Sequence, residues 1–311
     1  SLPLEIETWN PEANSALWAR AYLPPGVSDF WLYWGNARAP AVNDNKLWTP
    51  SYKLVMHLSD RFVDNDHTIR DSTGDHDGEA SMSMDDDSPV PGVIGGSLRF
   101  QDLGPEELTS GDFIVVESSP LETNNWSSLT LEAWVRHGAA GEHRIICKSP
   151  SIIPSEHVFA LGFHGQNNDQ VDTQVYLRLG TDDNDAIELH TQSNAVKYGE
   201  TAQWHHLAMT WNGNWIRLYL DGVNVQIAHI GSTDYAQSIF YSGATLKDDT
   251  IPLTIANVNN LLETKDDARF FIGKLDEVRL SNRAHSAAWI LFQFQSMQDQ
   301  VVDYSAPDET L

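Results

Sequence analysis

The chain has 311 residues, with 44 Asp or Glu against 19 Lys or Arg, and its formal net charge is −25. A surface this acidic repels the phosphates of nucleic acids and anionic lipids, so neither is expected as a partner. Hydrophobic residues make up 41% of the sequence, enough for a sizeable core, but no apolar run is long enough to span a membrane. The single cysteine, Cys147, follows two isoleucines and is expected to be a buried apolar side chain.

Residues 1–51 form a strand-rich segment, with strands expected in LEIETW, SALWARAYL and DFWLYWGN. Three short strands are too few for a core, so this segment should pack on the chain that follows. Tryptophans that the rest of the chain leaves uncovered would form an aromatic patch of the kind that holds a sugar ring. Five tryptophans crowd the segment: Trp9, Trp18, Trp31, Trp34 and Trp48.

Residues 52–302 are expected to form one β domain. Residues 60–92 are acidic and rich in Asp, Asn and Gly, which predicts a long loop. From residue 97 onward, short alternating strands recur with turn residues between them, a spacing typical of a sandwich or barrel. Residues 285–300 predict a short C-terminal helix, and residues 303–311 a polar tail.

The clearest local pattern is WHHLAMTWNGNWIRLYLDGV, residues 204–223. Apolar side chains alternate on both sides of Asn212-Gly213-Asn214, which predicts a β-hairpin. Asp221-Gly222 then closes the second strand, because both residue types tolerate a positive φ.

The motifs DSTGD, GSLRF, LTLEAWV, WHHLAMTW, RLYLDGV and FFIGKLDEVRLSNRAHS follow one another between Tyr52 and Met297. In this order they resemble the laminin G-like, concanavalin A-type lectin and glucanase domains. The resemblance implies an all-β fold: an antiparallel jelly-roll β-sandwich with an N-terminal strand-rich segment and a short C-terminal helix.

A second resemblance covers residues 2–58, through LPLEIETWNPEANSALWARAYLP and DFWLYWGNARAP. These residues are similar to the C-terminal part of a bacterial domain of unknown function that often precedes such jelly rolls in envelope-associated proteins. The sequence is therefore expected to start inside a longer precursor. The resemblance implies export, to the periplasm, the cell surface or the extracellular space.

Calcium is the metal that the acidic loops favour, because it takes six to eight oxygen ligands. Asp71, Asp75 and Asp77 lie around Gly74 at a spacing that lets a curled loop converge on one ion. The alternative for Asp71 is an Asx-turn or loop cap. The resemblance adds Asp276 as a ligand of a structural calcium, so the expected metal residues are Asp71, Asp75 and Asp276; the alternative for Asp276 is acceptance of backbone N–H bonds.

Other groups are weaker candidates. The acidic tips around Asp85–Asp87, Asp182–Asp185 and Asp266–Asp267 read as solvated turns, although a metal bound at one would resemble the rim site of related domains. His205 and His206 point to opposite faces of a strand and cannot share a metal, and no HxH or HExxH motif supports zinc. The Glu-x-Asp-x-x-Glu strand of the glucanases of this fold is absent, so no catalytic residues are predicted; Glu5 and Glu7 lie outside the jelly roll.

The sequence is compatible with three functions. The first is a calcium-stabilised, non-enzymatic recognition or adhesion module of an exported bacterial protein, binding a glycan or a protein. The second is a structural spacer of a cell-envelope complex, with no ligand of its own. The third is a glycoside hydrolase or lyase on the same fold.

Overall fold

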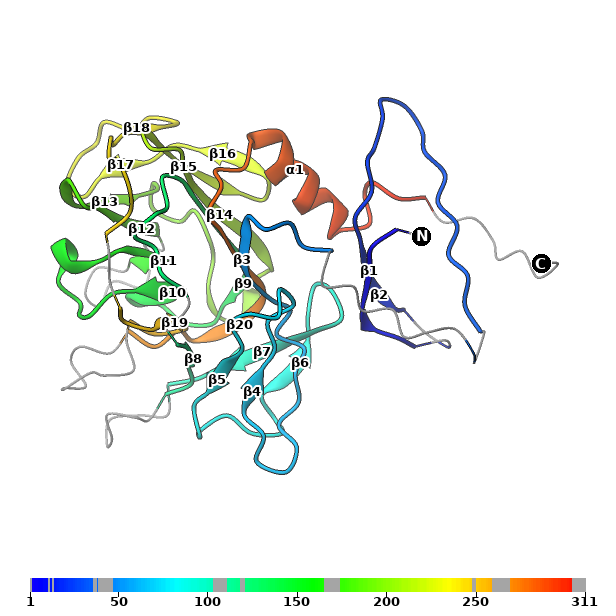
Figure 1. Cartoon of the computed structure of the whole chain (residues 1–311). Coiled ribbons are helices and arrows are strands. Elements are labelled where there is room, and N and C mark those ends of the chain that lie inside the picture. The colour runs from blue at the N-terminus through cyan, green and yellow to red at the C-terminus, as the bar shows by residue number, and fades with distance from the viewer. Residues whose placement is uncertain are drawn as a thin grey trace.

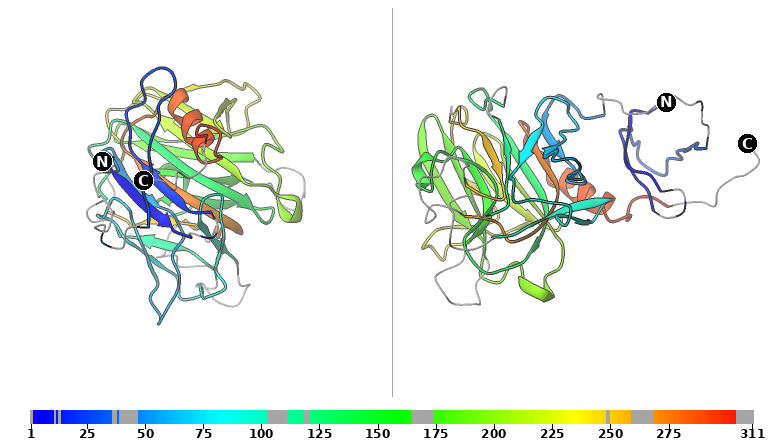
Figure 2. Two further views of the ribbon diagram at one scale, coloured as in Figure 1. Left: turned by 90° about the vertical axis from the view of Figure 1, so that its right-hand side faces the viewer. Right: turned by 90° about the horizontal axis from the view of Figure 1, so that it is seen from below.

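The computed structural model describes residues 2–10, 12, 14–35, 38, 47–102, 111–117, 121–164, 174–247, 250–258 and 269–303. Two large antiparallel sheets face each other, and a two-stranded hairpin lies beside them on the side of the C-terminal helix (Figures 1 and 2). No helix in these ranges has the length and apolar character needed to cross a membrane.

The first sheet has nine strands. Their order is β17 (Ala228–His229), β13 (Asn184–His190), β12 (Gln174–Thr181), β11 (Phe159–His164), β10 (His143–Lys148), β19 (Leu253–Ile255), β8 (Ile114–Val116), β5 (Gly78–Ala80) and β4 (Thr68–Ile69).

The second sheet also has nine strands. Its main path is β16 (Val223–Val225), β15 (Trp215–Leu220), β14 (His205–Trp211), β9 (Leu129–His137), β20 (Gly273–Ser281), β7 (Gly96–Phe100) and β6 (Pro89–Pro91). Off this path, β18 (Ile239–Phe240) pairs with β15, and β3 (Tyr52–Met56) pairs with β20. Every strand pair is antiparallel, which confirms the predicted all-β jelly-roll sandwich.

The apolar core lies between the sheets. Alternate residues of each strand point inward, as the period of two requires. In β9 these are Leu131, Ala133 and Val135, and β14 contributes Leu207 and Met209, all fully buried. Cys147 is buried too, as expected.

The predicted hairpin of residues 204–223 is present as β14 and β15. Its tip is a three-residue turn in which Asn212 Oδ1 accepts the backbone N–H groups of Asn214 and Trp215, and Gly213 has φ +87°. Asp221 and Gly222 both have positive φ, 51° and 76°, and they join β15 to β16 in a two-residue turn.

Helix α1 (Ala287–Ser296) begins after Ser286, whose hydroxyl accepts the N–H of Trp289. It is shorter than the predicted range of 285–300. Its buried Ile290 packs on Ala208 and Tyr219, so the helix covers the outer face of the second sheet.

Two regions differ from the prediction. The acidic segment 60–92 is not a simple loop, since β4, β5 and β6 lie in it and add to both sheets. At the N-terminus, β1 (Leu4–Thr8) pairs with β2 (Ala16–Ala19), but residues 29–34 form no strand. These six residues have no strand partner within the described ranges, and Trp31 and Tyr33 are exposed.

Candidate functional site

A polar hollow of about 440 Å³ opens at the loop end of the sandwich. It lies where the β12–β13 turn of the first sheet meets the β14–β15 turn of the second. Its lining residues are small or polar: Ser127, Asp183, Asn184, Asn212, Gly213, Asn214, Ser242 and Gly243. We call it the loop-end hollow.

Hydrogen bonds fix its rim. Asp183 Oδ2 accepts the N–H of Ala244 at 3.2 Å, and the Asn184 side chain donates to the Ser242 carbonyl at 2.9 Å. The N–H of Gly243 donates to the Gly213 carbonyl at 3.1 Å. The two turns are therefore held together by a third loop, and the hollow is formed before any ligand arrives.

An exposed aromatic pair lies beside the loop-end hollow. Trp215 follows Asn214 directly and pairs across the strands with Phe240. Their ring centroids are 5.2 Å apart, and 40% of Trp215 and 58% of Phe240 are exposed. Exposed aromatic faces next to polar groups are suited to a ligand with both hydroxyl and apolar surfaces, such as a sugar.

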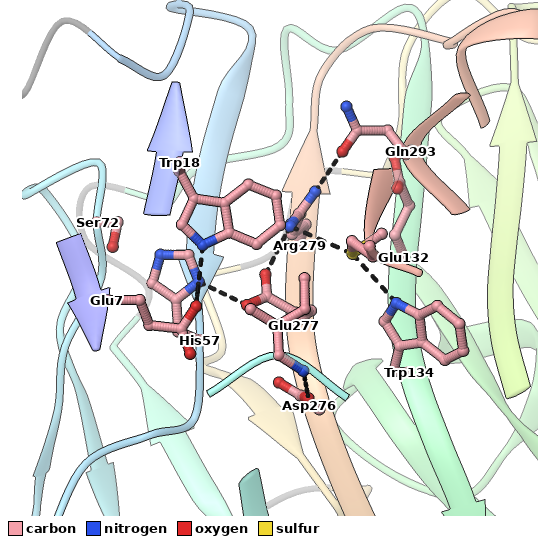
Figure 3. A network of polar contacts seen from close by, with 12 residues as sticks. Glu7, Trp18, His57, Ser72, Glu132, Trp134, Asp276, Glu277, Arg279 and Gln293 are labelled. Atoms are coloured by element: carbon pink, nitrogen blue, oxygen red, sulfur yellow. Dashed lines mark hydrogen bonds and ion pairs between the residues drawn. The ribbon is translucent and has the colours of Figure 1, made fainter. Parts of the chain in front are cut away.

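A second polar group of residues is buried where the N-terminal hairpin meets the second sheet (Figure 3). We call Glu5, Glu7, His57, Glu277 and Arg279 the charged cluster. Glu5 and Glu7 come from β1, His57 follows β3, and Glu277 and Arg279 come from β20. The side chains of Glu7 and Glu277 are each 1% exposed and that of His57 is 8% exposed.

Its ion pairs are close. His57 Nδ1 lies 2.7 Å from Glu277 Oε1 and 3.7 Å from Glu7 Oε2, while His57 Nε2 lies 3.5 Å from Glu5 Oε1. Arg279 donates to Glu277 Oε2 at 2.6 Å. These contacts join segments more than two hundred residues apart in the sequence.

Aromatic side chains surround the charged cluster. The guanidinium of Arg279 lies 4.4 Å from the ring centroid of Trp18 and 5.1 Å from that of Trp48. The Trp18 ring also stacks on His57 with centroids 5.5 Å apart. Trp18 and Trp48 are therefore the N-terminal tryptophans that the jelly roll covers, whereas Trp9, Trp31 and Trp34 stay exposed.

The charges shift the pKa values in this cluster. Burial raises the pKa of Glu7, and the charge of Glu277 adds to this, to about 8. Burial alone would lower the pKa of His57, but Glu277, Glu5 and Glu7 together outweigh it and raise the pKa to about 10. Burial would raise the pKa of Glu277, but His57 and Arg279 hold it below its usual value. At neutral pH the cations of His57 and Arg279 are thus balanced by Glu277 and Glu5, with Glu7 protonated.

A bulge in β20 makes this arrangement possible. Asp276 pairs with Trp134 and Arg279 pairs with Glu132, so two residues of β20 oppose one residue of β9. Glu277 has φ 53°, and it therefore joins Arg279 on the outer face instead of pointing into the core.

The predicted metal residues are not brought together into one ligand set. Asp71 is buried, and its Oδ1 accepts the N–H groups of Val55 and Thr73, while its Oδ2 accepts that of His76. These contacts are those of a loop cap. Asp75 is exposed and lines a separate hollow of about 450 Å³ that also contains Trp48 and Tyr52.

The two carboxylate oxygens of Asp276 differ in their surroundings. Its Oδ2 accepts the N–H groups of Val93 and Ile94 at 2.7 and 3.2 Å, and Oδ1 is buried with no hydrogen-bond partner among the described residues. Burial and the neighbouring Glu277 raise its pKa well above the usual range. Within the described ranges, the group of three close metal-ligand side chains is instead Glu7, His57 and Glu277.

Of the weaker candidates, Asp183 reaches the loop-end hollow, and Asp266 and Asp267 lie outside the described residues. His206 is buried on the outer face, with Nε2 3.6 Å from Glu132 Oε2, and His205 pairs with Asp221 at 2.8 Å. The charged cluster itself was not predicted. Its one sequence signal is the alternation of Glu5 and Glu7 in β1, and that signal lies outside the jelly roll.

The two facing antiparallel sheets form a jelly-roll β-sandwich with a polar hollow at its loop end. The family model described as the concanavalin A-like lectin/glucanases superfamily matches residues 108–291, more than half of the chain, and the chain belongs to this superfamily. No curated protein matches the chain.

Solved structures share the fold. The binding domain of paraclostridial mosquitocidal protein 1 aligns with a TM-score of 0.52 and 15% identity, over 79% of this chain and 52% of that one. The receptor binding domain of the botulinum neurotoxin C/D mosaic serotype aligns with a TM-score of 0.50 and 14% identity, over 81% and 52%. The chain thus spans about half the length of these structures, and the low identities establish the fold alone.

Proposed function

We propose that this protein is a non-enzymatic recognition module that binds a glycan at the loop-end hollow. The observation that carries the proposal is the combination of a fixed polar rim, with Asp183 and the Asn212–Asn214 turn, and the exposed pair Trp215 and Phe240 beside it. Carboxylate, amide and backbone groups would bind sugar hydroxyls, and an aromatic ring would cover the apolar face of the sugar.

The lining of the hollow supports a binding role over hydrolysis. Glycoside hydrolases need two carboxyl groups on either side of the scissile bond. Asp183 is the one carboxylate among the residues that line the hollow. The neighbouring folds also support binding, because the two structures described above are a binding domain and a receptor binding domain.

A glycan array, followed by calorimetry on any hit, tests the proposal. We expect binding that falls at least tenfold in Trp215→Ala and in Asp183→Ala. Trp31→Ala is the control, because Trp31 is also an exposed tryptophan, at 69%, and it is far from the hollow in sequence. Binding that is unaffected by Trp215→Ala would move the site elsewhere, and an array without any hit would favour the spacer function.

Calcium stabilisation and export stay predictions. For calcium, we expect EDTA to lower the melting temperature and added calcium to restore it, because an ion that binds only the folded state stabilises by mass action. A melting curve that does not respond to either addition would exclude a structural calcium. Fractionation of cells that express the protein would test export.

A further inference from the structure

We infer that the charged cluster is a binding site for a divalent transition-metal ion, zinc foremost, with His57, Glu7 and Glu277 as its ligands. This inference is independent of the glycan proposal. It starts from the spacing of the ligand atoms: one atom from each of the three side chains lies within 4.8 Å of the others. Zinc binds nitrogen and carboxylate oxygen at about 2.0–2.2 Å, so ligand atoms around it are separated by about 3–4 Å.

His57 Nδ1 is the common atom of the site. It lies 2.7 Å from Glu277 Oε1 and 3.7 Å from Glu7 Oε2. An ion between these atoms would replace the hydrogen bond of His57 to Glu277 and open that distance from 2.7 Å to about 3–4 Å. The three ligands come from three segments, namely β1, the end of β3 and the bulge of β20.

Each ligand also has a partner that orients it, as metal ligands in proteins usually do. His57 presents Nε2 to Glu5 Oε1 at 3.5 Å, a carboxylate–histidine arrangement typical of metal sites. Trp18 Nε1 donates to Glu7 Oε2 at 2.9 Å. Arg279 holds Glu277 by Oε2, which leaves Oε1 facing the imidazole.

The outer partner is itself fixed. Ser72 donates to Glu5 Oε1 at 2.5 Å, and Trp48 Nε1 donates to Glu5 Oε2 at 2.8 Å. Glu5 is thus held in place beside His57 Nε2, in the way that a second ligand shell supports the first.

A separate observation points to a missing cation. Glu7 Oε1 and Asp276 Oδ1 are buried oxygens with no hydrogen-bond partner within the described residues, and the Glu7 side chain is 1% exposed. Without a metal, the charges of Glu5 and Glu277 balance those of His57 and Arg279. Ligation would remove the protons of Glu7 and His57, and a divalent ion would compensate the two negative charges that this leaves.

The ligand types favour zinc over calcium. Calcium prefers oxygen ligands and a high coordination number, whereas one imidazole and two carboxylates suit zinc and neighbouring transition metals. Because the site is almost closed to solvent, its ion would be structural and would fasten the β1–β2 hairpin to the second sheet.

Metal analysis by plasma mass spectrometry tests this inference on the whole chain, purified without a chelator and without a polyhistidine tag. We expect about one zinc per chain, and a metal-free sample whose melting temperature zinc raises further when calcium is already present. A chain with no transition metal, whose melting temperature zinc leaves unchanged, would overturn the inference and leave protons as the compensating charge.

Variants locate the ion. His57→Gln and Glu7→Gln should lose zinc, and Glu122→Gln, an exposed carboxylate elsewhere, should keep it. If the ligand variants fail to fold, Glu5→Gln keeps the ligands, and it should weaken zinc binding about 10–100-fold. Cobalt substitution gives a visible spectrum whose bands report the coordination number of the ion. Equal zinc content in all variants would contradict the site.

Discussion

The loop-end hollow and the charged cluster are both polar, but they are built in opposite ways. The hollow is open, its residues belong to short turns, and its rim is fixed mainly by backbone groups. The charged cluster is closed, and its residues come from strands at both ends of the chain. The loop-end hollow can therefore change its side chains with little cost to folding, whereas the charged cluster is part of what holds the fold together.

The largest expected loss of stability comes from a substitution that breaks the charged cluster. Arg279→Met removes the guanidinium that neutralises Glu277, a carboxylate whose side chain is 1% exposed. Leaving a buried charge without its partner costs about 3–5 kcal/mol, so the urea midpoint should fall sharply. Arg217→Met, on the half-exposed side of β15, is the control and should change stability by less than about 0.5 kcal/mol. A similar midpoint in both variants would show that the cluster does not hold the hairpin in place.

A smaller loss of stability is expected when Asp71 is replaced. Asp71→Ala leaves the buried N–H of Val55 without its acceptor, which costs about 1–3 kcal/mol. If Asp71 is a loop cap, thermal unfolding should show this loss equally in calcium and in EDTA. A variant that is as stable as the parent protein in EDTA, and weaker only in calcium, would instead make Asp71 a calcium ligand. Asp75→Ala, at an exposed position, is the control.

A histidine buried in the core, His137, should make the stability of the protein depend on pH. His137 stacks on Phe163 with centroids 3.9 Å apart, and burial, together with the nearby His143, lowers its pKa to about 2. The unfolded chain therefore binds a proton below about pH 6.5 that the folded chain does not bind. Stability is lost as the pH falls below this value, by about 1.4 kcal/mol per pH unit for this group.

Urea unfolding between pH 7 and pH 4 measures the effect. His137→Phe should reduce the slope of stability against pH, because it removes one of the neutral buried imidazoles. His143 and His157 keep the remainder, since burial lowers their pKa values as well. An unchanged slope would mean that His137 is protonated in the folded protein.

The smallest expected effect concerns the loop-end hollow. Trp215 is 40% exposed and lies outside the apolar core, so Trp215→Ala should change the melting temperature very little. Its stability change should stay within about 0.5 kcal/mol, even where ligand binding is lost. A large loss of stability would instead make the Trp215–Phe240 contact structural.

The sequence predicted the strands and turns that are determined by residues close to one another in the chain. Alternation located β9, β14, β15 and β20, and Asn-Gly and Asp-Gly located the turns of the hairpin, because these signals are set within a few residues. Turn residues likewise placed Asp183 at a loop tip. Alternation also predicted a strand in residues 29–34, but no strand formed there, because a strand also needs a partner strand.

What escaped prediction depends on distant partners. Glu132, Glu277 and Arg279 occupy the outer positions of strands, where charged residues normally face solvent. They are buried because the N-terminal hairpin and α1 cover that face, and no local pattern carries this information. The two-residue strand β4 escaped as well, because two residues have no period to detect.

The position of β20 has a consequence for how the protein is made. This strand lies between β9 on one side and β7 and β3 on the other, yet it follows all of them in the sequence. On the ribosome, the earlier strands of the second sheet must wait with unpaired edges until Gly273–Ser281 has emerged. Folding of the sandwich is therefore slow and depends on long-range contacts, and the nascent protein is most exposed to aggregation just before β20 arrives.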